Sequence, residues 1–244
     1  MILPLRIGLV GGVKKFVSLL FVLGALLAST IAWTAPYPTK TQFEDAIAAI
    51  APMVKQQAGL EVIAESGGGW DVSLMAANLA RGKCRIVYDL EPTKEIIQDF
   101  FLPIADENLA AWLRAIVVHE ATHCVQYKDA FMDGHLDGIV PPQYSRQITT
   151  REAFILKRQE EPFTLWREAA SDIAAVLYLA EEAPSCWRIL VSHLYDIRRR
   201  EASSAPEHDT SAWILGMLNS TQEPLVSQSN LFEAAFTLRV KLQP

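Results

Sequence analysis

Residues 107–128 read ENLAAWLRAIVVHEATHCVQYK, and this stretch predicts the helix around which the rest of the chain is organised. Neither glycine nor proline interrupts it. Its apolar residues recur at helical spacing: Leu109, Trp112, Leu113, Ile116 and Val117. Further along, His119 and His123 are four residues apart. Because residues four apart lie on one face of a helix, both imidazoles can point at a single site.

Glu120 completes the pattern His-Glu-x-x-His in the pentapeptide HEATH. Two imidazole nitrogens at this spacing suit a tetrahedral zinc ion. A glutamate beside them stands where a general base can take a proton from zinc-bound water. The pattern is the signature of zinc metallopeptidases. The alternative is an exposed helix with two histidines and a salt-bridging glutamate, but the apolar residues run directly into the motif and favour a functional site.

A third zinc ligand must come from elsewhere in the chain, since catalytic zinc sites use three protein ligands and water. The metzincin pattern is excluded, because Gln126 and Asp129 occupy its glycine and third-histidine positions. Residues 164–181 (TLWREAASDIAAVLYLAE) predict a later helix, and Glu168 lies in it among small and apolar residues. Glu168 is therefore the predicted third ligand.

Asp172 lies four residues after Glu168, on the same face of that helix. A carboxylate at this position can accept the free ring N–H of a zinc-bound histidine and fix its tautomer. A glutamate and an aspartate at this spacing are also common on surface helices. Their occurrence together with HEATH favours the metal site, and the neighbouring alanines would let a second helix approach closely.

These motifs together resemble those of the gluzincin metallopeptidases. The run 167–175, REAASDIAA, is similar to the RExxxDxxA frame of the membrane-associated CaaX-protease and heat-shock-protease family, and its EAASD part is similar to thermolysin's second motif. The resemblance covers the two motif helices. It implies a zincin-like metallopeptidase domain, Zn²⁺ as cofactor and peptide-bond hydrolysis. The implied residues are His119, His123 and Glu168 as ligands, Glu120 as base and Asp172 as the orienting carboxylate.

That family often has a later His-Pro pair opening a helix near the site, and His208 resembles this histidine. It stands ahead of an apolar stretch, 212–218, and could donate a hydrogen bond to the oxyanion of the reaction. Asp209 replaces the family's proline, so an exposed histidine before a helix cap is the alternative. His193 and Tyr195 are weaker candidates for the same role.

The rest of the chain predicts a single, mainly α-helical domain with a small β-sheet (α+β) over residues 36–244. A helix is expected over 41–51, and Pro52 is expected to end or kink it. The glycines 67–69 predict a turn or loop, most simply a hairpin connection. Residues 83–90 (KCRIVYDL) predict a strand. A peptide substrate could add itself to this strand, although an ordinary core strand fits equally well.

Charge argues against one class of partner. The formal net charge is -6 and the pI is near 5.4, which argue against nucleic acid as a partner. The expected partner is a peptide or protein substrate. The short run Arg198–Arg200 predicts a solvated helix end.

The N-terminal residues 1–35 have the pattern of a targeting segment. Basic residues precede an apolar run, 16–28, followed by small residues and then Pro36. The segment is either a signal peptide, cleaved after Ala32 or Ala35, or an N-terminal membrane anchor barely long enough to span a bilayer. Both alternatives place the domain outside the cytoplasm, in the periplasm or on the extracellular face of a membrane.

Export permits disulfides, but the three cysteines leave at least one unpaired in a monomer. Cys124 follows the second histidine on another side of the helix, so it is expected in the core or in a disulfide. We therefore predict an exported zinc metallopeptidase. The rival from another class is a non-catalytic, zinc-stabilised binding or assembly factor of the cell envelope. A helical protein that binds no metal is a further alternative.

Overall fold

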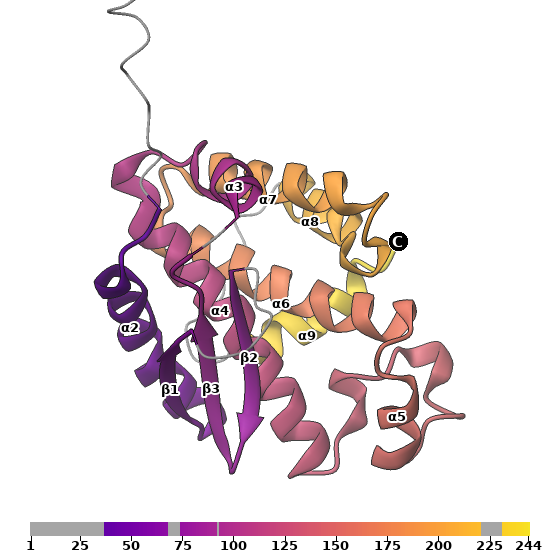
Figure 1. Ribbon diagram of the computed structural model, residues 1–244. Coiled ribbons are helices and arrows are strands. Elements are labelled where there is room, and N and C mark those ends of the chain that lie inside the picture. The colour runs from indigo at the N-terminus through magenta and orange to yellow at the C-terminus, as the bar shows by residue number, and fades with distance from the viewer. Residues whose placement is uncertain (1–36, 68–73, 92, 221–230) are drawn as a thin grey trace, which may run out of the picture. The chain divides into compact units, whose positions relative to one another are not determined.

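The computed structural model is mainly helical with a three-stranded sheet, the α+β class that the sequence predicts (Figure 1). The predicted targeting segment lies outside the residues that the structure describes. In the described part of the chain, no helix combines the length and apolar character that crossing a bilayer requires. The described residues are 37–67, 74–91, 93–220 and 231–244.

The sheet contains β1 (Glu61–Ser66), β2 (Met75–Ala80) and β3 (Lys83–Tyr88), in the order β1-β3-β2. β1 pairs with β3 in parallel, and β2 pairs with β3 in antiparallel orientation. Arg81 and Gly82 connect β2 to β3 with φ angles of 52° and 73°. Two consecutive positive φ angles are what a two-residue type I′ hairpin requires.

The strand order contradicts the predicted hairpin, and it confirms the core-strand alternative for residues 83–90. β1 and β2 are not neighbours in the sheet, so glycines 67–69 do not join two adjacent strands as the predicted hairpin would; residues 68–73 lie outside the described part of the chain. β3 is the central strand, so both its edges are paired and it cannot accept a peptide. The edge strand beside the HEATH helix is β2, whose sequence MAANLA is poor in β-formers and was missed for that reason.

Helix α2 (Lys40–Ala58) begins with a reciprocal capping box between Thr39 and Gln42. Of the two alternatives for Pro52, the structure excludes a helix end, because α2 continues for six more residues. Pro52 and Ala48 both lie on the exposed face. Since Pro52 cannot donate to the Ala48 carbonyl, water can satisfy that carbonyl there, which makes the proline tolerable. The buried stripe of α2 includes Phe43, Ile47 and Ile50, which recur at helical spacing.

Helices α4 (Asp106–Phe131) and α6 (Glu161–Glu182) contain the two motifs and pack against each other. They run antiparallel, because Arg114 pairs with Glu182 near one end while Gln126 hydrogen-bonds the Arg167 carbonyl near the other. Small side chains line α6, as the sequence predicts, and they are at most 4% exposed: Ala169, Ala170, Ala174 and Ala175.

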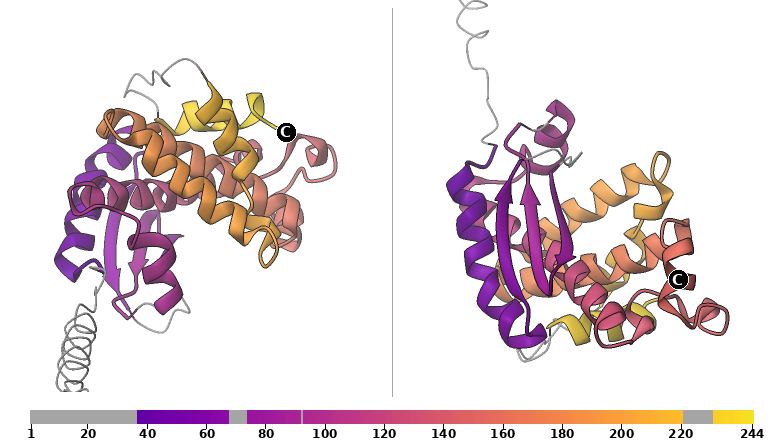
Figure 2. Two further views of the ribbon diagram at one scale, coloured as in Figure 1. Left: turned by 90° about the horizontal axis from the view of Figure 1, so that it is seen from above. Right: turned by 60° about the horizontal axis from the view of Figure 1, so that its bottom comes forward.

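Helix α4 lies at the centre of the fold, with the sheet on one side of it and α6 to α9 on the other (Figures 1 and 2). A disulfide between Cys84 of β3 and Cys124 of α4 joins the sheet to the HEATH helix. This bond confirms the disulfide alternative for Cys124 and leaves Cys186 free. In the described residues, the other helices are α3 (Lys94–Ile96), the π-helix η1 (Ile97–Phe101), α5 (Arg151–Lys157), α7 (Trp187–Glu201), α8 (Ser211–Asn219) and α9 (Leu231–Lys241). Short 3₁₀ turns are η2 (Leu136–Gly138), η3 (Pro142–Tyr144) and η4 (Pro206–His208).

Candidate metal centre

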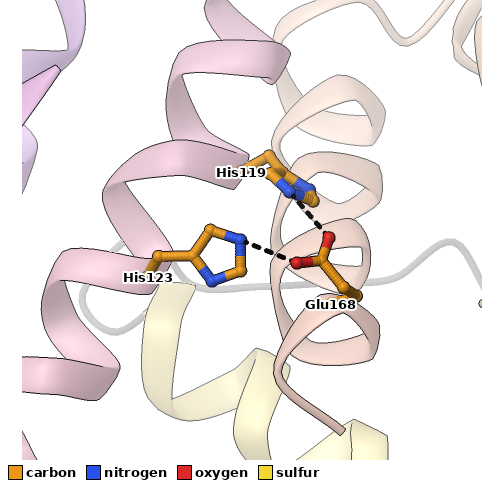
Figure 3. Close-up of side chains that lie close together, drawn as sticks. All are labelled: His119, His123 and Glu168. Atoms are coloured by element: carbon orange, nitrogen blue, oxygen red, sulfur yellow. Dashed lines mark ion pairs between the residues drawn. The ribbon is translucent and has the colours of Figure 1, made fainter. Parts of the chain in front are cut away.

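His119, His123 and Glu168 form a group that can hold a metal ion. His119 Nε2 lies 3.3 Å from Glu168 Oε2, and His123 Nε2 lies 3.3 Å from Glu168 Oε1, so both imidazoles face the Glu168 carboxylate (Figure 3). One ligand atom from each residue lies within 4.8 Å of the others. Their side chains are 11–13% exposed, so the site is nearly closed to solvent.

The spacing of these donors fits a tetrahedral ion. Two donors bonded at about 2.0–2.1 Å to a tetrahedral zinc lie about 3.3–3.4 Å apart. Each histidine Nε2 lies 3.3 Å from a different oxygen of the Glu168 carboxylate, which matches this value. The centroids of the two imidazole rings are 5.0 Å apart and the ring planes are nearly perpendicular. Neither ring therefore blocks the other from the site. Two neutral imidazole nitrogens and one carboxylate oxygen are a donor set that suits zinc and related transition-metal ions.

The orientation of His119 is fixed by Asp172, the residue the sequence proposes for this task. His119 Nδ1 lies 2.8 Å from Asp172 Oδ1. An ionised carboxylate only accepts, so Nδ1 carries the proton and donates it. Burial by itself lowers the pKa of His119, but the charges of Asp172 and Glu168 outweigh it and raise that pKa to about 10. In the absence of metal, both nitrogens of His119 therefore donate to carboxylates, and a metal ion must displace the Nε2 proton.

Asp172 is itself held by Arg198 and Thr210. Arg198 donates from Nε to Oδ2 at 2.8 Å and from Nη2 to Oδ1 at 2.9 Å, and Thr210 Oγ1 also donates to Oδ2. Burial raises the pKa of Asp172, but Arg198 and His119 outweigh it and hold that pKa below its usual range. The carboxylate is thus ionised and immobile, as an orienting acceptor must be.

Arg198 corrects an expectation from the sequence. Arg198 is 8% exposed, whereas Arg199 and Arg200 are exposed. Only part of the arginine run is therefore a solvated helix end. Arg198 Nη2 also lies 3.7 Å from Glu168 Oε2, which brings its charge beside the third ligand. A signal was present in the sequence, because Arg198 continues the buried stripe of Val191 and Leu194 at helical spacing.

His123 is oriented by a neutral amide. Its Nδ1 atom lies 3.1 Å from Gln126 Oε1 and 3.3 Å from Ser171 Oγ. Gln126 is fully buried, and its Nε2 atom donates to the Arg167 carbonyl at 3.1 Å, which leaves Oε1 as the group facing the ring. Gln126 is the residue that excludes the metzincin pattern, and the sequence analysis assigned it no role. Its position three residues after His123 on one helix face was the available signal.

Glu120 lines the same cavity as the two histidines. Burial raises the pKa of its carboxyl group, and the neighbouring His119 and His123 partly offset this effect. The cavity has a volume of about 520 Å³ and also reaches the edge strand at residues 74–77. A carboxylate beside the ligands, and not among them, is the arrangement that a general base needs.

His208, the predicted oxyanion donor, lies in η4 and lines the cavity. His193 and Tyr195 are not among the described residues that line it. The His193 ring instead packs 5.3 Å from Trp112, and the Tyr195 hydroxyl accepts from Arg199 at 2.8 Å. Of the three candidates, only His208 therefore lies where a substrate can contact it.

No protein-family model, curated protein or solved structure matches this chain. The function must therefore be argued from the residues of the site and from their geometry.

Proposed function

We propose that the protein is an exported zinc metallopeptidase of the gluzincin type, with a zincin-like domain that resembles the membrane-associated CaaX-protease and heat-shock-protease family. One observation carries the proposal: His119, His123 and Glu168 converge with 3.3 Å donor spacings while Glu120 lines the same cavity. Imidazole nitrogens and one carboxylate, with room for water, are the ligands of catalytic zinc sites.

Zinc, when bound, would lower the pKa of a coordinated water molecule and polarise the scissile carbonyl. Glu120 takes one proton from the attacking water, whose oxygen bonds to the carbonyl carbon. When the C–N bond breaks, Glu120 passes this proton to the leaving amine, so it ends the cycle unchanged. His208 donates a hydrogen bond to the oxyanion, and Asp172 keeps the His119 ring in its ligand orientation.

A peptide is the substrate that suits the cavity. The wall at residues 74–77 belongs largely to β2, an edge strand that pairs only with β3 among the described strands. An extended peptide can hydrogen-bond to such an edge and so pass the metal ligands in a fixed register.

Export is supported by the disulfide. A buried Cys84–Cys124 bond is typical of oxidising compartments and rare in the cytoplasm. The apolar run in residues 1–35 agrees with it as a signal peptide or anchor. We therefore place the domain in the periplasm or on the outer face of a membrane.

The rival function, a non-catalytic factor held together by zinc, receives less support. A structural zinc site has four protein ligands, whereas the group in the described residues has three. A structural site also has no use for a base, and Glu120 is present at the cavity.

The proposal is tested by replacing Glu120 with glutamine. Glu120→Gln should keep its zinc and lose hydrolysis of blocked peptides by a factor of about 10² or more, since only the proton acceptor is removed. Glu107→Gln, an exposed residue of the same helix, is the matched control and should keep full activity. Retained turnover in Glu120→Gln would overturn the mechanism.

A further inference from the structure

The cavity has two walls of different origin. In the described residues, those that hold or orient the candidate metal ion lie on helices and on the turn before α8, and none belongs to the sheet. The other wall, residues 74–77, belongs largely to β2 and therefore to the sheet. Binding of a peptide at the edge of β2 thus depends on how firmly the sheet is held against α4.

The side chains of β2 hold it only weakly against α4. Three of its six residues are alanines, and Met75 is the one buried residue of the strand. Because the stabilisation scales with the apolar area that is buried, alanine methyl groups contribute little to this contact. β2 is therefore held in place mainly by its pairing with β3, in which Ala77 lies opposite Ile86 and Leu79 lies opposite Cys84.

A disulfide fixes β3 to α4 at the residue next to a metal ligand. Cys84 of β3 is bonded to Cys124, which directly follows His123. The Cys124 sulfur also lies 3.5 Å from the carbonyl oxygen of Asn78 in β2. Asn78 is the next residue after the cavity wall at 74–77. The disulfide therefore lies where the ligand helix meets the strand that offers its edge to a peptide.

The disulfide is closed to solvent in the folded protein. Cys84 and Cys124 are both 0% exposed, so a reductant or an oxidant reaches them only when the sheet separates from α4. The free thiol of Cys186 lies 3.2 Å from Asn108 Oδ1. Asn108 precedes Cys124 by sixteen residues, about 24 Å along α4, so Cys186 cannot exchange with the pair inside the folded domain. The oxidation state of the pair is thus set while the chain folds.

We infer that the Cys84–Cys124 disulfide positions the β2 edge against the metal ligands, and that the protein binds peptides only after this pair is oxidised. The reduced chain keeps its ligands in place on α4 and α6, but its β2 edge is no longer held in register with them. This inference rests on the proposed peptidase function and adds its regulation. A chain that has not left the reducing cytoplasm is inactive, and oxidation during folding in an oxidising compartment activates it.

The activating reaction is a thiol–disulfide exchange, and its oxidant is another disulfide, that of an oxidoreductase or of glutathione. One cysteine thiolate attacks a sulfur of the oxidant and releases the first thiol. The second cysteine thiolate then attacks the mixed disulfide and releases the second thiol. The two cysteines lose two electrons and two protons, and the two released thiols carry them away.

Two hydroxamate probes separate the metal from the edge. Acetohydroxamate contacts the metal alone, whereas the hydroxamate of acetyl-trialanine adds a peptide backbone that can pair with β2. Their dissociation constants are measured with the zinc-loaded full chain as oxidised wild type, as wild type refolded with dithiothreitol, and as Cys84→Ala/Cys124→Ala. Cys186→Ala is the matched control, because Cys186 is a free thiol.

In oxidised wild type and in Cys186→Ala, the trialanine probe should bind at least about fivefold more tightly than acetohydroxamate, which is the effect of about one net hydrogen bond. Reduction or the double substitution should abolish this advantage, while acetohydroxamate and zinc bind as before. Glutathione disulfide should restore the advantage in reduced wild type and have no effect on the double variant. In peptide hydrolysis, the loss of the bond should raise KM and leave kcat within about twofold.

An undiminished advantage of the trialanine probe in the reduced protein would overturn the inference. An equal loss of both probes would also overturn it, since the disulfide would then support the metal site itself. If the oxidised wild type shows the expected advantage but hydrolyses no peptide, the proposed function alone is wrong. If neither probe binds to the oxidised wild type, both are wrong.

Discussion

Arg198 forms a two-point ion pair with Asp172, with N–O distances of 2.8 and 2.9 Å, although the two residues belong to different helices. The Asp172 carboxylate is 1% exposed and also accepts a hydrogen bond from His119. The carboxylate thus interacts both with a permanent cation and with the ring of His119, one of the three candidate metal ligands. The pair therefore joins the stability of the fold to the orientation of the site.

Arg198→Met should destabilise the protein by about 3–5 kcal/mol, because it leaves the buried Asp172 carboxylate without its main partner. The change in the free energy of unfolding is measured by urea titration. Arg199→Met is the control, since Arg199 is exposed, and it should stay within about 0.5 kcal/mol of wild type. A loss below 1 kcal/mol in Arg198→Met would show that the ion pair is not required.

Gln126→Met should weaken zinc binding by about 10-fold or more, because methionine fills the space but offers His123 no strong acceptor. Gln126→Glu restores an acceptor at the same place and should bind zinc at least as tightly as wild type. Zinc dissociation constants are obtained by competition with a chelator. Gln143→Met, at an exposed position, serves as control. Equal affinities in all four proteins would mean that His123 needs no partner at Nδ1.

The Cys84–Cys124 bond should contribute about 2–4 kcal/mol to stability, since it closes a loop of 40 residues between the sheet and α4. Reduction by dithiothreitol should lower the unfolding free energy of wild type by this amount. The same treatment should not affect a Cys84→Ala/Cys124→Ala variant, while Cys186→Ala should respond like wild type. A wild type insensitive to the reductant would contradict this role.

The parts of the site that follow from spacing along a helix were predictable. His119, Glu120 and His123 share one turn of α4, and Glu168 with Asp172 shares one turn of α6, so local periodicity was sufficient to place each set. The general fold class followed from the same periodicity, and so did helices α2, α4 and α6.

The parts that depend on contacts distant in sequence were not predictable. The helical spacing of Arg198 with Val191 and Leu194 indicated its burial, but its contact with Asp172 exists only because α7 packs beside α6, which no local pattern specifies. β2 pairs with β3 through a two-residue turn. This pairing outweighs the weak intrinsic strand preference of the alanines in β2. Whether Pro52 would end α2 could not be decided from the sequence, because the effect of the proline depends on which face of α2 is exposed, and tertiary packing sets that face.

The central claim is that His119, His123 and Glu168 together hold one zinc ion, and zinc content of the purified protein tests it most directly. Wild type should contain one zinc per chain, and Glu168→Ala and Glu168→Gln should lose it while keeping the helical circular dichroism spectrum. Glu161→Ala, at the exposed start of the same helix, should retain zinc. A zinc-free wild type, or full zinc in both Glu168 variants, would contradict the three-ligand site.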